Sequence, residues 1–155
     1  MADKYILNED KAKGDCVVFK AHKALQRGEL LEIVGKADSI LGTGDLELYE
    51  VKTADANTKR GNLLVNISVP KMFDERLTER DFELAKDEAG RGRNPKVHCV
   101  HTIAKALVSG EVAEKDKLKL GTGVFEKDED GSATVAVVED VFNWKGQESV
   151  MIRYI

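Results

Sequence analysis

Apolar residues in most of this chain form short runs that turn residues interrupt, as in strands joined by tight connections. Several runs alternate between apolar and polar positions, which is the period of a half-buried strand. The predicted strands cover residues 16–19, 29–34, 46–51, 63–69, 97–103, 117–125, 134–138 and 149–154. A set of about eight to ten short strands predicts a mainly β fold, a small β-barrel or sandwich.

Two connections have specific turn chemistry. Pro70 follows the apolar run 63–69 and cannot donate to a strand ladder, so we expect that strand to end there. Asp130-Gly131 suits the positive φ angles of a two-residue hairpin turn. It predicts a hairpin between Val124-Phe125 and residues 134–138.

One segment has the signals of a helix instead. Thr78 and Asp81 have the spacing of a capping box, and Phe82 begins an apolar face at helical spacing. Gly90 supplies a left-handed stop. We therefore predict one short α-helical insert at about residues 78–90.

The chain of 155 residues is long enough to bury a core as one domain. Residues 1–15 are polar apart from Tyr5, Ile6 and Leu7, and they predict an N-terminal arm that orders when it docks on a partner. A frayed terminus is the alternative. Residues 16–155 are predicted to form the single β-rich domain.

The overall charge narrows the range of partners. The formal net charge is −4 and the basic residues are dispersed, which argues against nucleic acid as the partner. No apolar window approaches the roughly 18 residues of a membrane helix, and no signal peptide is visible, so synthesis in a cytoplasm is expected and a membrane partner is not. Cys16 and Cys99 are expected to be reduced, buried thiols, and a disulfide between them is the alternative.

The best metal-like cluster is His98-Cys99-Val100-His101. Residues three apart in a strand point to opposite faces, so the two histidines are not expected to share a metal. We predict half-buried strand histidines here, and we expect His22, beside lysines, on the surface.

Glu126, Asp128, Asp130 and Gly131 match the first positions of a calcium loop. The twelfth position should be a bidentate glutamate but is Val137, and the flanks read as strands, so a solvated hairpin tip is the better interpretation.

Two glycine pairs, Gly42-Thr-Gly44 and Gly121-Thr-Gly123, lack the sequence of a phosphate-binding loop. No Gly-x-Ser-x-Gly elbow occurs either. We therefore predict no enzyme, with no catalytic, cofactor-binding or metal-binding residues. Arg91, Arg93 and Lys96 form the only compact basic patch, either a solvated loop or a docking surface for an acidic partner.

The block from Leu63 to Gly92 resembles a pattern in small virion proteins of tailed bacteriophages, of the head decoration (cement) and head-fibre type. In those proteins an apolar strand leads into a Pro-Lys-Met-Phe-Asp-Glu motif, a short helix and a Gly-Arg turn. Residues 14–35 and 148–154 are similar to the ends of such domains. The matching residues are Val69-Pro70, Met72-Phe73-Asp74-Glu75, Leu77, Phe82, Ala89-Gly90 and Arg93.

The resemblance implies a capsid decoration protein that binds the outer surface of the major capsid shell and stabilises it. Its partner would be the major capsid protein, it would self-associate (many such proteins are trimers), and it would lie on the capsid surface after synthesis in the host cytoplasm. Residues 1–15 are the candidate docking arm. The alternatives are another virion component of the neck or tail, and a cytosolic ligand-binding or protein-binding β-barrel.

Overall fold

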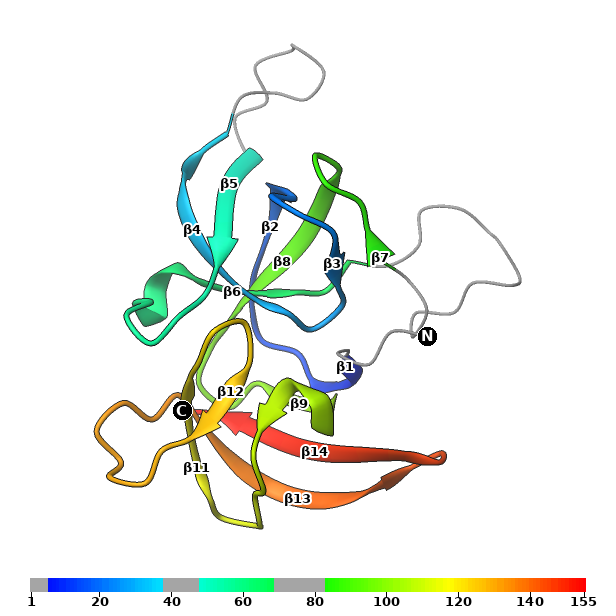
Figure 1. Ribbon diagram of the computed structural model, residues 1–155, viewed down its shortest axis with the longest axis vertical. Helices are drawn as coiled ribbons and strands as arrows, with labels where there is room; N and C mark the ends of the chain where they lie inside the picture. The colour runs from blue at the N-terminus through cyan, green and yellow to red at the C-terminus, as the bar shows by residue number, and fades with distance from the viewer. Residues whose placement is uncertain (1–5, 38–47, 69–82) are drawn as a thin grey trace.

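The computed structural model describes residues 6–37, 48–68 and 83–155, and it confirms a mainly β fold that contains a closed barrel (Figure 1). The five-stranded barrel has the order β2-β5-β4-β6-β8 and is built from β2 (Gly14–Lys20), β4 (Leu30–Lys36), β5 (Leu48–Thr53), β6 (Leu63–Asn66) and β8 (Ala89–Pro95).

A seven-stranded sheet packs beside the barrel, in the order β1-β9-β14-β13-β11-β12-β10. Its strands are β1 (Ile6–Lys11), β9 (Val100–Ala104), β10 (Val108–Ser109), β11 (Lys117–Leu120), β12 (Phe125–Lys127), β13 (Ala136–Trp144) and β14 (Gln147–Tyr154). A two-stranded ladder and two 3-10 turns complete the described elements: β3 (Leu25–Gln26), β7 (Glu83–Leu84), η1 (Arg60–Asn62) and η2 (Lys105–Leu107). Within the described ranges no helix is both long and apolar enough to cross a membrane.

The start of β4 and the whole of β6 are buried on both faces and join the barrel to the sheet. Leu30, Leu63 and Val65 pack into the core shared with the sheet. Their neighbours Leu31 and Leu64 point the other way, into the barrel interior. Successive side chains of a strand point to opposite faces, so β4 and β6 form a wall between two cores. This explains why Leu30-Leu31 and Leu63–Val65 are consecutive apolar residues that do not alternate with polar ones.

The prediction of a helix over residues 78–90 is wrong for its described part. Residues 78–82 lie outside the described residues, while residues 83–90 form β7, a turn with Asp87 at φ 67°, and the start of β8. A Cβ at Gly90 would lie 2.5 Å from Leu84 Cδ2 and 2.8 Å from Phe19 Cζ. Gly90 therefore allows close strand packing and does not end a helix, because pairing of β8 with β2 over seven positions outweighs the local capping signals.

Part of the predicted N-terminal arm belongs to the folded body. Residues 6–11 form β1, which pairs with β9, and Ile6 is buried in the shared core. Gly14 already opens β2, so no boundary falls at residue 16 in the described structure. The pairing of β1 contains two register shifts, which is why its sequence lacks a regular alternation.

The chain bends at Asp130-Gly131, but the predicted hairpin does not form. Gly131 has φ 70°, as a tight turn requires. However, β12 and β13 both pair with β11, on its two sides, so the connection crosses over β11. The turn signal is local and does not determine which strands pair. The predicted strand end at Pro70 lies outside the described residues, and β6 itself ends at Asn66.

Candidate functional site

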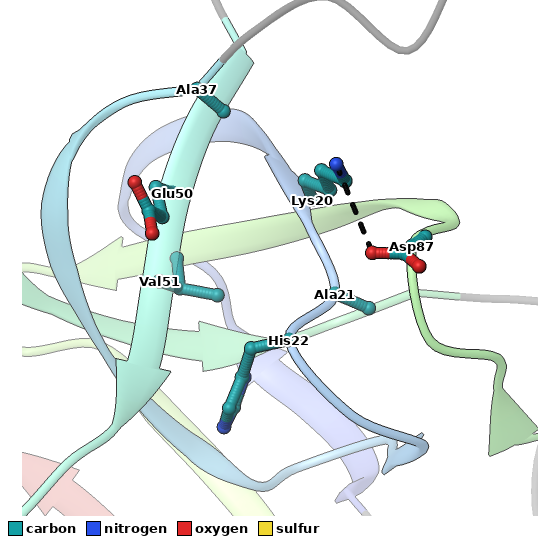
Figure 2. Close-up of a pocket in the computed structure, with 7 residues that line it drawn as sticks. All are labelled: Lys20, Ala21, His22, Ala37, Glu50, Val51 and Asp87. Atoms are coloured by element: carbon teal, nitrogen blue, oxygen red, sulfur yellow. Dashed lines mark ion pairs between the residues drawn. The ribbon is translucent and has the colours of Figure 1, made fainter.

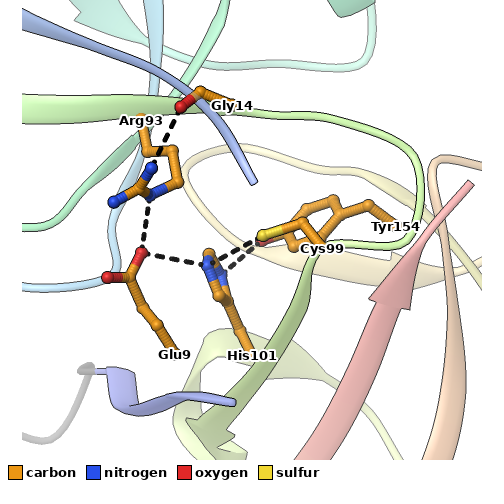
Figure 3. Close-up of polar contacts among 6 residues, drawn as sticks. All are labelled: Glu9, Gly14, Arg93, Cys99, His101 and Tyr154. Carbon is orange, nitrogen blue, oxygen red and sulfur yellow. Dashed lines mark hydrogen bonds and ion pairs between the residues drawn. The ribbon is translucent and has the colours of Figure 1, made fainter. Parts of the chain in front are cut away.

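A buried cluster of polar side chains lies where β1, the barrel and the sheet meet (Figure 3). Arg93 of β8 donates from Nε to Glu9 Oε1 at 2.8 Å and from Nη1 to the Gly14 carbonyl at 3.0 Å. His101 Nε2 lies 3.3 Å from the same Glu9 oxygen. Glu9 thus connects the first strand to both a barrel strand and a sheet strand.

The second ring nitrogen of His101 also has a partner. Its Nδ1 lies 3.0 Å from the Tyr154 hydroxyl, and the two rings meet edge to face with centroids 5.1 Å apart. Cys99 Sγ lies 3.4 Å from His101 Nε2. His101, Cys99 and Tyr154 are fully buried. The polar groups around the imidazole therefore satisfy one another without solvent.

The cluster shifts the pKa values of its members. Hydrogen bonding to His101, together with Arg93, lowers the pKa of Glu9 from 4.5 to about 2, although burial opposes this shift. Burial would lower the pKa of His101, but hydrogen bonds with Cys99 and Glu9 outweigh burial and raise it. Glu9 is therefore the carboxylate that Arg93 and His101 share.

The cluster contains Cys, His and Glu but not the geometry of a nucleophilic triad. In a triad the nucleophile and the carboxylate bind opposite ring nitrogens of the histidine. Here Cys99 and Glu9 both contact Nε2, and Tyr154 occupies Nδ1. With Cys99 fully buried, the arrangement supports a structural role, which fixes β1 against the two sheets.

The structure separates the two predicted strand histidines. His98 is exposed in the turn before β9, with φ 69°, whereas His101 is buried. Among the described residues, no group of three or more His, Cys, Asp or Glu side chains is placed to hold a metal ion. Cys99 is a buried free thiol as expected, but Cys16 is a free thiol on the surface.

The segment that matches the first positions of a calcium loop forms a connection whose carboxylates accept hydrogen bonds from residues of the same loop. Asp128 Oδ2 accepts hydrogen bonds from the Ala133 N–H at 3.1 Å and the Thr134 hydroxyl at 2.6 Å. Asp130 accepts from both the side chain and the backbone of Ser132, and these bonds lower its pKa to about 2. The carboxylates shape the connection between β12 and β13.

The glycine pair at residues 121–123 joins the two sheets. The Gly123 N–H donates to the Ala54 carbonyl at 2.9 Å, and the Gly123 carbonyl accepts from Leu30 at 3.3 Å. The pair Gly42-Thr-Gly44 lies outside the described residues.

The three basic residues of the predicted patch separate in the structure. Arg93 points into the buried cluster, Arg91 is exposed on β8, and Lys96 lies at the end of β8. Lys96 instead joins Lys13 and Arg60 around an open concavity. Sequence reasoning missed this grouping because the three cations come from distant parts of the chain.

A second concavity opens at one end of the barrel (Figure 2). It has a volume of about 230 Å³, and Lys20 and Asp87 form an ion pair of 3.8 Å at its edge. His22, predicted on the surface, is partly buried here and its Nε2 lies 3.0 Å from Thr53 Oγ1. Burial, with the charge of Lys23, lowers the pKa of His22.

The longest strands form a hairpin that extends past the rest of the sheet, and we call residues 139–148 the hairpin arm (Figure 1). Its turn has Lys145 at φ 49° and Gly146 at φ 85°, the positive pair that matches the twist of a two-residue hairpin. Trp144 packs on Phe142 with ring centroids 6.2 Å apart, and Lys145 Nζ lies 5.5 Å from the Trp144 ring. Trp144 is 36% exposed and Val141 is 43% exposed.

One edge of the hairpin arm is unpaired. Strand β13 pairs with β11 only at Ala136 and Val137, whereas β14 pairs with β9 from Ser149 to Arg153. On the side of β13 that faces away from β14, no strand of the described residues lies beside residues 139–144. The unpaired backbone groups and the exposed apolar side chains of Val141 and Trp144 thus lie together on the hairpin arm.

Comparison with models of known protein families gives no match, and comparison with curated protein sequences gives none either.

Proposed function

We propose that this protein is a bacteriophage capsid decoration protein, which binds the outer surface of the major capsid shell and stabilises it without catalysing a reaction. The observation that carries this proposal is the hairpin arm, which exposes Trp144 on one face and Val141 on the other, beside an unpaired strand edge. Its buried base is held in the sheet core by Val138 and Val150, so the arm presents a preformed surface.

The energetics suit attachment to a lattice. One arm offers a small apolar surface, and so a single contact with the shell is weak. A shell repeats the same site many times, and self-association of the decoration protein would link several contacts into a strong total, as in multivalent binding. The sequence resemblance to head decoration and head-fibre proteins supports the same role. A position on the capsid surface after synthesis in the host cytoplasm is part of this proposal.

The test is co-sedimentation with expanded heads assembled from the major capsid protein of the same genome. We expect saturable binding at a copy number set by the lattice symmetry. Replacing Val141 and Trp144 together by serine removes the exposed apolar side chains from both faces of the hairpin arm and should weaken binding about tenfold or more. The matched control is Val34→Ser, because Val34 is 57% exposed on barrel strand β4, away from the arm.

Two results would contradict the proposal. One is failure of the wild-type protein to pellet with heads under conditions where it is folded by circular dichroism. The other is equal binding by the double variant and by Val34→Ser, which would remove the arm from the interaction.

The barrel-end concavity favours a second candidate, a ligand-binding β-barrel. His22 Nδ1 is buried there without a hydrogen-bond partner, so a ligand with a donor or acceptor would find an unused polar atom. This candidate predicts a chemical-shift change of the His22 ring when a small-molecule library is screened by NMR. The capsid proposal predicts that head binding leaves this ring unchanged.

A further inference from the structure

The open concavity that groups Lys13, Arg60 and Lys96 lies at the end of β14 opposite the hairpin arm, and we call it the basic dish. Four segments distant in sequence form it: the link between β1 and β2, η1, the end of β8 with the turn after it, and Ile155. Its volume of about 570 Å³ lies within the range of roughly 300–1,000 Å³ that is typical of binding pockets.

The dish combines an apolar surface with positive charge. Pro95, Val97 and Ile155 line it, and Val97 and Ile155 are 53% and 40% exposed. The three cations are its charged residues, and no acidic side chain lines it in the described ranges. A chain with a formal net charge of −4 thus has a local surface of opposite sign.

Arg60 lines the dish and has a guanidinium nitrogen without a hydrogen-bond partner. Its guanidinium lies 5.4 Å from the centre of the Tyr154 ring, a cation–π contact that fixes its direction. Its Nη1 is buried without a hydrogen-bond partner. Burial lowers the pKa of Arg60, but an arginine remains charged at neutral pH. An anion that reaches Nη1 therefore gains a charge-assisted hydrogen bond at a donor that folding has already desolvated.

The lysines at the edge are available to the same ligand. Lys13 is exposed, and Lys96 forms an ion pair of 3.4 Å with Asp15 in which both side chains are largely exposed. Exposed pairs of this kind contribute little and exchange readily with other anions.

We infer that the basic dish binds an acidic peptide segment of a partner protein, with an aliphatic side chain on Val97 and Ile155 and carboxylates on the three cations. Charge complementarity identifies this occupant. Nucleic acid fits less well, because among the described residues no aromatic ring lines the dish to stack a base, whereas Val97 and Ile155 offer an apolar surface that suits an aliphatic side chain. The inference goes beyond capsid decoration, since any partner with such a segment would bind.

The probe is a fluorescein-labelled peptide of sequence Asp-Glu-Leu-Ile-Asp-Glu, blocked at both ends and titrated by fluorescence anisotropy. We expect saturable binding that weakens with salt. Two control peptides should each lose at least about tenfold in affinity. One has Ser-Ser in place of Leu-Ile, and the other has lysines in place of the acidic residues. An eight-residue oligothymidine tests the nucleic-acid alternative.

Arg60→Gln should reduce affinity about tenfold, because a charge-assisted hydrogen bond is lost. Lys36→Gln is the control, since Lys36 is exposed at the far end of β4. If Arg60→Gln fails to fold, Lys13→Gln combined with Lys96→Gln carries the test, because both residues are exposed and the fold should persist.

Absence of peptide binding up to millimolar concentration would overturn the inference. Equal peptide affinity of the Lys13→Gln/Lys96→Gln double variant and the Lys36→Gln control would also overturn it. So would tighter binding of oligothymidine than of the peptide. Failure of head binding through the hairpin arm would leave these measurements unaffected, so the two proposals fail separately.

Discussion

Replacing Glu9 by glutamine tests whether the buried cluster holds the first strand in place. The substitution keeps the size of the side chain but removes the anion that Arg93 and His101 share. Arg93 and His101 then lose their common partner in a site where the Arg93 and Glu9 side chains are only 15% and 18% exposed. We expect β1 to be the element that loosens, because Glu9 is its polar link to the barrel.

The magnitude follows from the pKa of Glu9. Lowering that pKa from 4.5 to about 2 corresponds to about 3 kcal/mol of folding free energy, because each tenfold change in ionisation is worth about 1.4 kcal/mol. We therefore expect Glu9→Gln to lower the free energy of unfolding at pH 6 by about 2–3 kcal/mol.

The sign of the pH dependence is specific. The lowered pKa of Glu9 stabilises the fold above its ordinary value, and this contribution is lost as the pH falls from about 4.5 to about 2. The raised pKa of His101 acts in the opposite direction, and its contribution is complete below about pH 6.5 and is lost as the pH rises through the folded-state value. The cluster should therefore stabilise the protein most between about pH 4.5 and 6.5.

Urea denaturation followed by far-ultraviolet circular dichroism, from pH 2 to pH 8, measures both effects. The difference between wild type and Glu9→Gln should be largest near pH 5–6 and should shrink towards pH 2. Glu111→Gln is the control, because the Glu111 side chain is 97% exposed and its loss should leave the curve unchanged. A difference that is the same at all pH values, or no difference at pH 6, would refute the reasoning.

Two further substitutions test the packing around the barrel and the cluster. Gly90→Ala should destabilise the protein by about 1–3 kcal/mol in a thermal melt, because its Cβ would lie within 3 Å of two apolar side chains. The control is Gly35→Ala, whose Cβ would have nothing within 4 Å and should cost far less. Equal melting temperatures of the two variants would contradict this account of Gly90. Tyr154→Phe keeps the ring but leaves His101 Nδ1 without its partner, and we expect a loss of about 1–2 kcal/mol in urea denaturation. An unchanged midpoint would show that the hydroxyl contributes nothing to the cluster.

Most strands were predictable from local pattern. The apolar runs at residues 16–19, 29–34 and 149–154 lie within β2, β4 and β14, apart from Glu29 at the start of the second run. The strands that escaped prediction, such as β8 with three of its seven residues glycine or proline, have no apolar alternation. Their strand conformation comes from pairing with distant partners, β2 and β6 in the case of β8.

The buried cluster could not be predicted from the chain alone. Glu9 lies 84 residues from Arg93, and His101 lies 53 residues from Tyr154. The pattern around His101 signalled histidines in or near a strand, but nothing local showed which would be buried or which carboxylate would face it. The basic dish is similar, because Lys13, Arg60 and Lys96 meet only after the two sheets assemble.

By itself, the order of residues determined the mainly β class, because two-residue periodicity and turn residues act over a few positions. It also determined the bend at Asp130-Gly131, because that bend depends on one glycine with positive φ. Tertiary structure alone decided that five strands close into a barrel and seven form a sheet, and that residues 83–90 become strand and turn instead of helix. The physical reason is that hydrogen-bonded pairing and burial join residues far apart in the chain, and their energy exceeds the local preferences that a short window of sequence expresses.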